Sequence, residues 1–165
     1  MKKNITILCN SQNFKKRVAK NLADQLDMLY ADLEQILEYN MINDDMLEKA
    51  GQQYFDENEK STLKNVANYE NTVITLDFST LNKENNAEIL RQSTLVIYLS
   101  LEHNIFDSLN VSENDKNLAS INEIVYADRD KLLRSFADIT VDVSKVDINL
   151  VTQQIMLSIQ QYFEK

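Results

Sequence analysis

Three short and almost uninterrupted apolar runs constrain the fold of this chain more than any other feature. They are NITILC (4–9), NTVITLDF (71–78) and STLVIYLSL (93–101). A strand with one face in water alternates apolar and polar residues, whereas a strand buried on both faces is apolar throughout. The three runs therefore predict central strands of a parallel sheet that is covered by helices on both faces.

Segments with helical spacing separate these runs. After the first run, Phe14, Val18, Leu22 and Leu26 recur at every fourth position, which predicts an amphipathic helix. Residues 33–68 are predicted to be mostly helical, with a break at Gly51. Further helices are predicted at 83–92, at 120–136 and in the segment that begins near Ile148, with two shorter strands at 27–31 and 137–144. This alternation predicts a single domain (1–165) with three αβα layers and a five-stranded parallel sheet.

The composition argues against several classes of function. There are 26 acidic and 17 basic side chains, a formal net charge of −9, so broad binding to nucleic acid or to an anionic membrane surface is not expected. No apolar run is long enough to span a bilayer, and the N-terminus lacks a signal-peptide pattern. The single cysteine, Cys9, fits a reducing cytoplasm and is interpreted as a small core residue.

The segment after the first strand has the outline of a phosphate-binding loop. In CNSQNFKKR (9–17) a short polar stretch leads into a helix, and Lys15 stands at the helix start. The glycines of such loops are absent, and Lys16 follows Lys15 where Ser or Thr would hold magnesium, although an ammonium could replace part of the charge of the metal. The basic cluster around Lys15, Lys16 and Arg17 is either an anion site or a solvated basic face.

Because ligands bind at the carboxyl ends of strands in parallel sheets, residues 9–16, 31–34 and 77–80 are expected around one cleft. Asp32 and Glu34, in the second of these ranges, could orient a hydroxyl and a metal, or could simply be acids at a helix start. Arg129 could bind a carboxylate through two of its guanidinium nitrogens or pair with a surface acid. No set of residues has the spacing of a metal site.

With Lys15 placed on the loop lysine, the chain resembles the shikimate kinases, a family with the P-loop kinase fold, over most of its length. The match is carried by NLADQLDMLYADLEQILE (21–38), which contains Asp32 and Glu34, and by RDKLLRSFADITVDVS (129–144), which begins with Arg129. The resemblance implies catalytic roles for Lys15 and Asp32 and substrate binding by Glu34 and Arg129. It also implies phosphate or anion binding by Lys15, Lys16 and Arg17, with ATP and Mg²⁺ as cofactors if the protein is active.

The chain also departs from the family pattern. Asp56 stands where the family has a second substrate-binding arginine, DFS (77–79) replaces a glycine triplet, and Leu133 replaces a tyrosine. The segment NVSENDKNLAS (110–120) contains one cation, Lys116, where an arginine-bearing lid is expected.

Two functions remain open. The first is a non-catalytic or impaired member of the family, a binding or regulatory module for a small anionic ligand or a protein partner. The alternative is an active ATP-dependent small-molecule kinase with an atypical phosphate loop, which transfers a phosphoryl group to a hydroxyl. A third interpretation, an unrelated flavodoxin-like domain, requires the match to arise by chance.

Overall fold

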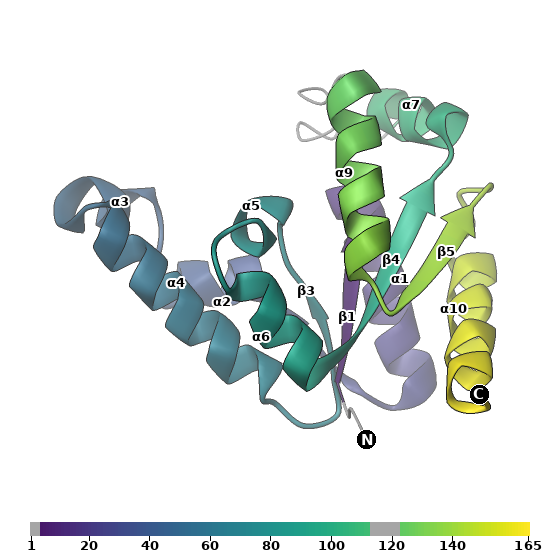
Figure 1. The fold of residues 1–165 in the computed structure, drawn as a ribbon, viewed down its shortest axis with the longest axis horizontal. Helices are drawn as coiled ribbons and strands as arrows, with labels where there is room; N and C mark the ends of the chain where they lie inside the picture. The colour runs from purple at the N-terminus through teal and green to yellow at the C-terminus, as the bar shows by residue number, and fades with distance from the viewer. Residues whose placement is uncertain (1–3, 113–122) are drawn as a thin grey trace.

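A computed structural model describes residues 4–112 and 123–165 of the chain, and a five-stranded sheet forms its centre (Figure 1). All strand pairs are parallel, and the order across the sheet is β2-β3-β1-β4-β5. The strands are β1 (Asn4–Cys9), β2 (Leu29–Asp32), β3 (Thr72–Thr75), β4 (Thr94–Leu101) and β5 (Ile139–Val143). The predicted α/β class and five parallel strands are therefore confirmed.

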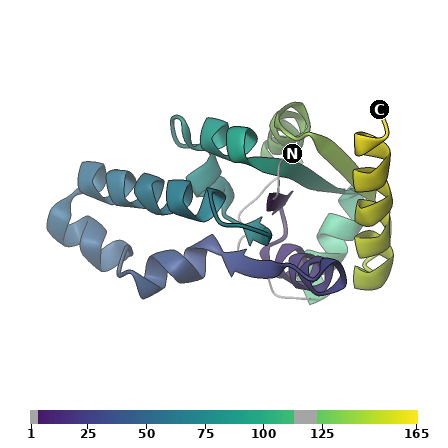
Figure 2. The same ribbon diagram turned by 90° about the horizontal axis from the view of Figure 1, so that it is seen from below.

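Helices cover both faces of the sheet, so the core has two halves. One half contains residues of α1 (Gln12–Leu26), α7 (His103–Ser112) and α10 (Ile148–Phe163). The other half contains residues of the remaining helices except α3. These helices are α2 (Leu33–Tyr39), α3 (Asp44–Ala50), α4 (Gln52–Ala67), α5 (Phe78–Leu81), α6 (Asn86–Ser93) and α9 (Glu123–Phe136). Figure 2 shows α1 and α10 on the opposite side of the sheet from α4 and α6, and α3 at the end of the molecule farthest from α10.

Several boundaries differ from the sequence-based prediction, and three of them, between β1 and α5, each have a local reason. The strand predicted at 71–78 ends at Thr75, because Asp77 becomes the N-cap of α5. The strand predicted at 27–31 begins at Leu29, since Asp27 ends α1 in a left-handed conformation (φ 53°). The first helix begins at Gln12 rather than Phe14, because Ser11 caps it.

The polar segment predicted as a loop at 110–117 lies partly in α7, which extends to Ser112, and its remainder lies outside the described residues. The break predicted at Gly51 is confirmed, since Gly51 separates α3 from α4 with a φ of 88°. No helix in the described ranges has the length and apolar character needed to cross a membrane.

A buried asparagine ties the first strand to the connection between α4 and β3. Asn4 is 2% exposed, and its Nδ2 donates to the carbonyl oxygens of Ala67 (3.1 Å) and Tyr69. Its Oδ1 accepts the backbone N–H of Thr72 at 3.0 Å. One side chain therefore satisfies three backbone groups where the chain enters β3.

We predict that Asn4→Leu lowers the free energy of unfolding by about 3 kcal/mol, because it leaves buried backbone groups without partners. Asn68→Ala is the matched control. The amide of Asn68, in the same connection, donates to the exposed carbonyl of Lys64 in the last turn of α4, so its removal should change stability by less than about 0.5 kcal/mol. Urea denaturation measures both, and equal midpoints for the two variants would contradict the role given to Asn4.

Candidate functional site

The connection between β1 and α1 consists of only two residues, Asn10 and Ser11. The N–H of Phe14 donates to Ser11 Oγ (3.4 Å), and the N–H of Lys15 donates to the Ser11 carbonyl (3.0 Å). No residue from 9 to 16 has a positive φ. In a phosphate loop, successive backbone amides point at the ligand instead. Here the amides of Phe14 and Lys15 are bonded to Ser11 in the first turn of α1.

The positions of the missing glycines are occupied by larger side chains. The phosphate-loop pattern G-x-x-x-x-G-K-[ST] has glycines six residues and one residue before the lysine. With Lys15 in this pattern, those positions are Cys9 and Phe14. Phe14 is 0% exposed and lies in the core between α1 and the sheet. The buried Phe14 side chain therefore packs at the start of the helix, at a position where the pattern requires glycine, the smallest residue.

Lys15 points into the protein. The residue is 1% exposed, and its Nζ donates to the carbonyl oxygen of Leu76 at 2.7 Å, just beyond the end of β3. Burial lowers the pKa of Lys15 from its ordinary value, and the carboxylates of Glu34 and Asp77 offset part of this effect. The ammonium thus joins α1 to the segment that follows β3.

Lys16 forms an ion pair with Asp32, with 3.0 Å between Nζ and Oδ2. Asp32 is 4% exposed, and its Oδ1 caps α2 by accepting the N–H of Glu34 (3.1 Å). Burial alone would raise the pKa of Asp32, but hydrogen bonds with Glu34 and Lys16 and the charge of Lys16 hold it below its usual value. An ammonium therefore contacts the buried acid directly.

Glu34 lies between the two lysines and the end of β3. Its Oε1 accepts the backbone N–H of Asp77, and its buried Oε2 receives no hydrogen bond from the described part of the chain. Burial, together with hydrogen bonding to Asp32, raises the pKa of Glu34 to about 7, although the charge of Lys15 opposes the shift. The raised pKa favours the protonated form of Glu34, whose O–H can donate to the carboxylate of Asp32.

A cavity of about 340 Å³ opens at the carboxyl ends of β1 and β3. Its lining residues are Cys9, Asn10, Gln12, Asp77, Phe78, Ser79, Asn82 and Arg129. Arg129 reaches it from α9, and its guanidinium carbon lies 4.4 Å from the centre of the Phe78 ring. The cavity thus combines one cation, one carboxylate and several neutral polar groups, a set suited to a small ligand with a carboxylate and hydroxyls.

A network of side chains fixes α9, the helix that carries Arg129. Asp130 Oδ1 accepts the hydroxyls of Tyr98 (2.8 Å) and Ser100 (2.5 Å), and Asp130 Oδ2 accepts Arg134 Nε (2.8 Å). Arg134 also bonds Asp142 (2.5 Å) at the end of β5. This network was not predicted from the sequence, although Asp130 and Arg134 stand four residues apart on one helix, a spacing typical of an ion pair.

The structure brings together only some of the residues singled out from the sequence. Residues from two of the three ranges expected around the cleft line the cavity together with Arg129, whereas Asp32 and Glu34, in the third range, lie outside its lining. Lys15, Lys16 and Arg17 do not converge: Lys15 is buried, Lys16 pairs with Asp32, and Arg17 is exposed. Cys9 is half-buried and lines the cavity as well as packing against the core. Among the described residues, no cluster of three His, Cys, Asp or Glu side chains could hold a metal.

Comparison with known proteins identifies the fold class first. A shikimate kinase from Acinetobacter baumannii, solved in complex with shikimate, superposes with a TM-score of 0.75 at 21% identity, covering 96% of this chain and 93% of that one. The shikimate kinase of Aquifex aeolicus gives 0.72 at 20% identity, covering 95% and 96%. The chain therefore has the α/β fold of the shikimate kinases.

The sequence comparisons then establish the family. The family model for shikimate kinase matches residues 14–160. A shikimate kinase from Sulfurihydrogenibium sp. is 25% identical over 168 residues, covering 96% of this chain and 99% of that protein. The chain belongs to the shikimate kinase family. The matched region begins at Phe14, after the connection between β1 and α1.

Glu34 gives the site a pH dependence that can be measured. A carboxyl whose folded pKa is raised from 4.5 to about 7 contributes stability below pH 4.5, and this contribution is lost as the pH rises through 7. Glu34→Gln stays neutral at every pH. We predict that its stability relative to the wild type increases by on the order of 2 kcal/mol between about pH 5.5 and pH 8.5. Denaturation at several pH values measures the difference.

Glu38→Gln, an exposed change on the same helix, is the control and should show no comparable trend. A stability difference between Glu34→Gln and the wild type that stays constant with pH would contradict a protonated Glu34.

Proposed function

We propose that this member of the shikimate kinase family binds a small carboxylate-bearing ligand beside Arg129 and does not transfer phosphate. It acts as a binding or regulatory module. The proposal rests mainly on the helical turn between β1 and Lys15, which stands where a phosphate loop would be. Lys15 itself is buried and donates to the Leu76 carbonyl.

The residues around Lys15 do not fit a magnesium–nucleotide complex. The amides of Phe14 and Lys15 are bonded to Ser11 in the first turn of α1, and the Lys15 ammonium donates to the Leu76 carbonyl. Lys16 stands where the pattern has the metal-binding hydroxyl, and its ammonium forms an ion pair with Asp32. Phosphoryl transfer depends on positioning and on electrostatic stabilisation of the phosphates. The loss of these elements together supports a protein without kinase activity.

The residues around Arg129 support ligand binding. Arg129 forms no ion pair with any described residue, so its guanidinium is available to a carboxylate, and stacking on Phe78 restricts its motion. Asp77, Ser79 and Asn82 also line the cavity and offer hydrogen bonds to hydroxyl groups of a ligand. The A. baumannii relative was solved with shikimate, a hydroxylated carboxylate of this class.

Calorimetric titration with shikimate, and with ATP and ADP in the presence of Mg²⁺, tests the proposal. We predict measurable binding of shikimate and no heat with either nucleotide. Arg129→Met should weaken shikimate binding roughly 10- to 100-fold, because a charge-assisted pair contributes about 1.5–3 kcal/mol. Arg91→Met is the matched control, since Arg91 also stacks on a phenylalanine, Phe136, but lies outside the cavity.

Two results would contradict the proposal. Micromolar binding of ATP followed by turnover of shikimate would establish the alternative, an active kinase with an atypical loop. The presence of Lys15, Asp32, Glu34 and Arg129 together is the observation in favour of that alternative. Equal shikimate affinity in the wild type and in Arg129→Met would remove Arg129 from the ligand site.

A further inference from the structure

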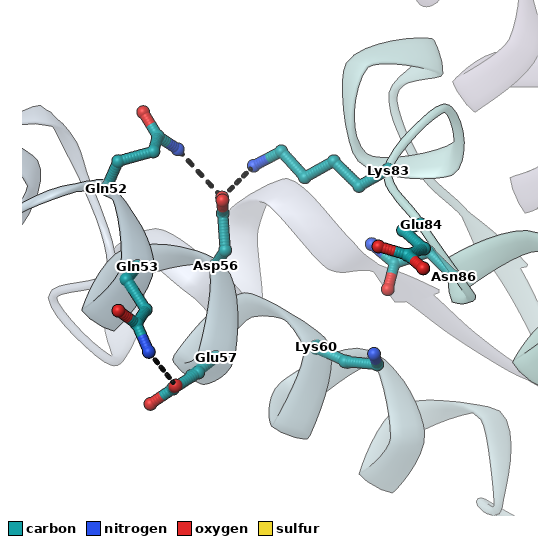
Figure 3. Close-up of a pocket in the computed structure, with 8 residues that line it drawn as sticks. All are labelled: Gln52, Gln53, Asp56, Glu57, Lys60, Lys83, Glu84 and Asn86. Atoms are coloured by element: carbon teal, nitrogen blue, oxygen red, sulfur yellow. Dashed lines mark hydrogen bonds and ion pairs between the residues drawn. The ribbon is translucent and has the colours of Figure 1, made fainter.

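A second cavity, of about 500 Å³, lies between α4 and the turn that leads into α6 (Figure 3). It shares no lining residue with the cavity beside Arg129. Its lining consists of Gln52, Gln53, Asp56, Glu57 and Lys60 on α4, and of Lys83, Glu84 and Asn86 on the facing side. Its volume is in the range of small-molecule sites.

Part of this lining is already neutralised within the protein. Lys83 forms ion pairs with Asp56 and Glu59, both at 2.8 Å, and its Nζ lies 4.8 Å from the centre of the Phe55 ring. Burial alone would lower the pKa of Lys83, but the hydrogen bonds and charges of the two carboxylates raise it above its ordinary value. Figure 3 shows Gln52 and Lys83 both directed at Asp56. Gln52, Asp56 and Lys83 therefore form one part of the cavity lining and are held in place by their contacts with one another.

Asn86 leaves one buried oxygen without a partner. The residue is 2% exposed, and its Nδ2 donates to the carbonyl oxygen of Thr80 at 2.8 Å. Because a carbonyl only accepts hydrogen bonds, this contact fixes the orientation of the amide. Asn86 Oδ1 is then buried with no donor among the described residues. Such an atom is costly to leave unsatisfied and is matched by a ligand N–H.

Two opposite charges in the lining also have no partner in the protein. The side chains of Glu84, in the turn before α6, and of Lys60, on α4, form no ion pair or hydrogen bond with any described residue. Figure 3 shows the Lys60 side chain reaching toward the side of the cavity that carries Glu84 and Asn86. The cavity thus presents a carboxylate and a buried amide oxygen together with an ammonium.

We propose that this cavity binds a free amino acid, a ligand that carries both an ammonium and a carboxylate group. The ligand ammonium donates to Asn86 Oδ1 and pairs with Glu84, and the ligand carboxylate pairs with Lys60. The site is independent of the cavity beside Arg129, so it gives the protein a second small-molecule ligand whether or not the first site is used.

NMR titration of the ¹⁵N-labelled full chain tests the proposal with three related probes. L-Glutamine carries both charges, N-acetyl-L-glutamine lacks the ammonium, and L-glutaminamide lacks the carboxylate. We expect L-glutamine to shift the Asn86 side-chain amide signals at concentrations up to about 10 mM, and the other two probes to bind at least roughly tenfold more weakly.

Two pairs of variants assign the charges. Lys60→Met should remove the preference for L-glutamine over L-glutaminamide, and Glu84→Gln should remove the preference over N-acetyl-L-glutamine. The control variants are Lys64→Met, on α4 like Lys60, and Glu88→Gln, on α6 just after the turn that carries Glu84. Both residues lie outside this cavity, so both preferences should stay unchanged.

Three results would overturn the proposal. The probes could bind with equal affinity, or none could shift the Asn86 signals. Alternatively, Lys60→Met could shift those signals and lower the melting temperature without any probe, which would show that Lys60 itself supplies the donor to Asn86.

Discussion

The hydrogen bond from the Lys15 ammonium to the Leu76 carbonyl connects the parts of the structure that meet at the cleft. It joins the first turn of α1 to the segment that follows β3, and it lies beside Glu34, which in turn accepts the N–H of Asp77. Removing an ammonium from water is costly, and its lowered pKa reflects that cost. The carbonyl and the nearby carboxyls offset part of it. The base of the cleft is therefore held together by polar contacts that a ligand does not reach.

The lysines near the start of α1 have different partners from the lysine of a phosphate loop. A phosphate loop directs its lysine and its amides outward, where they wait for a ligand. In this chain Lys15 is bonded to a carbonyl and Lys16 to Asp32, so both charges are satisfied by the fold. The ion pair also engages Asp32, the acid at the end of β2. Arg129, on the opposite side of the cleft, is the cation that still faces the cavity.

Local patterns were enough to predict the strands, most helices and the family, because apolar runs and helical spacing depend on neighbouring residues. They were not enough to predict the contacts of the site. Lys15 and Leu76 lie far apart in the sequence and meet only because β3 lies next to β1 in the sheet, an order that periodicity does not encode. The burial of Phe14 likewise depends on Ser11 starting the helix early, a capping effect that the resemblance to a phosphate loop obscured.

The position of Arg129 is fixed by residues that never touch the cavity. Its neighbour Asp130 accepts hydrogen bonds from the Tyr98 and Ser100 hydroxyls of β4, and Arg134 links the same helix to Asp142 in β5. Tyr98 also accepts a hydrogen bond from Asn10, which lines the cavity at the end of β1. Because α9 is fixed by these contacts and the Arg129 guanidinium stacks on Phe78, the Arg129 side chain has little conformational freedom left to lose when a ligand binds. Such preorganisation favours binding, and it does not require a phosphate loop.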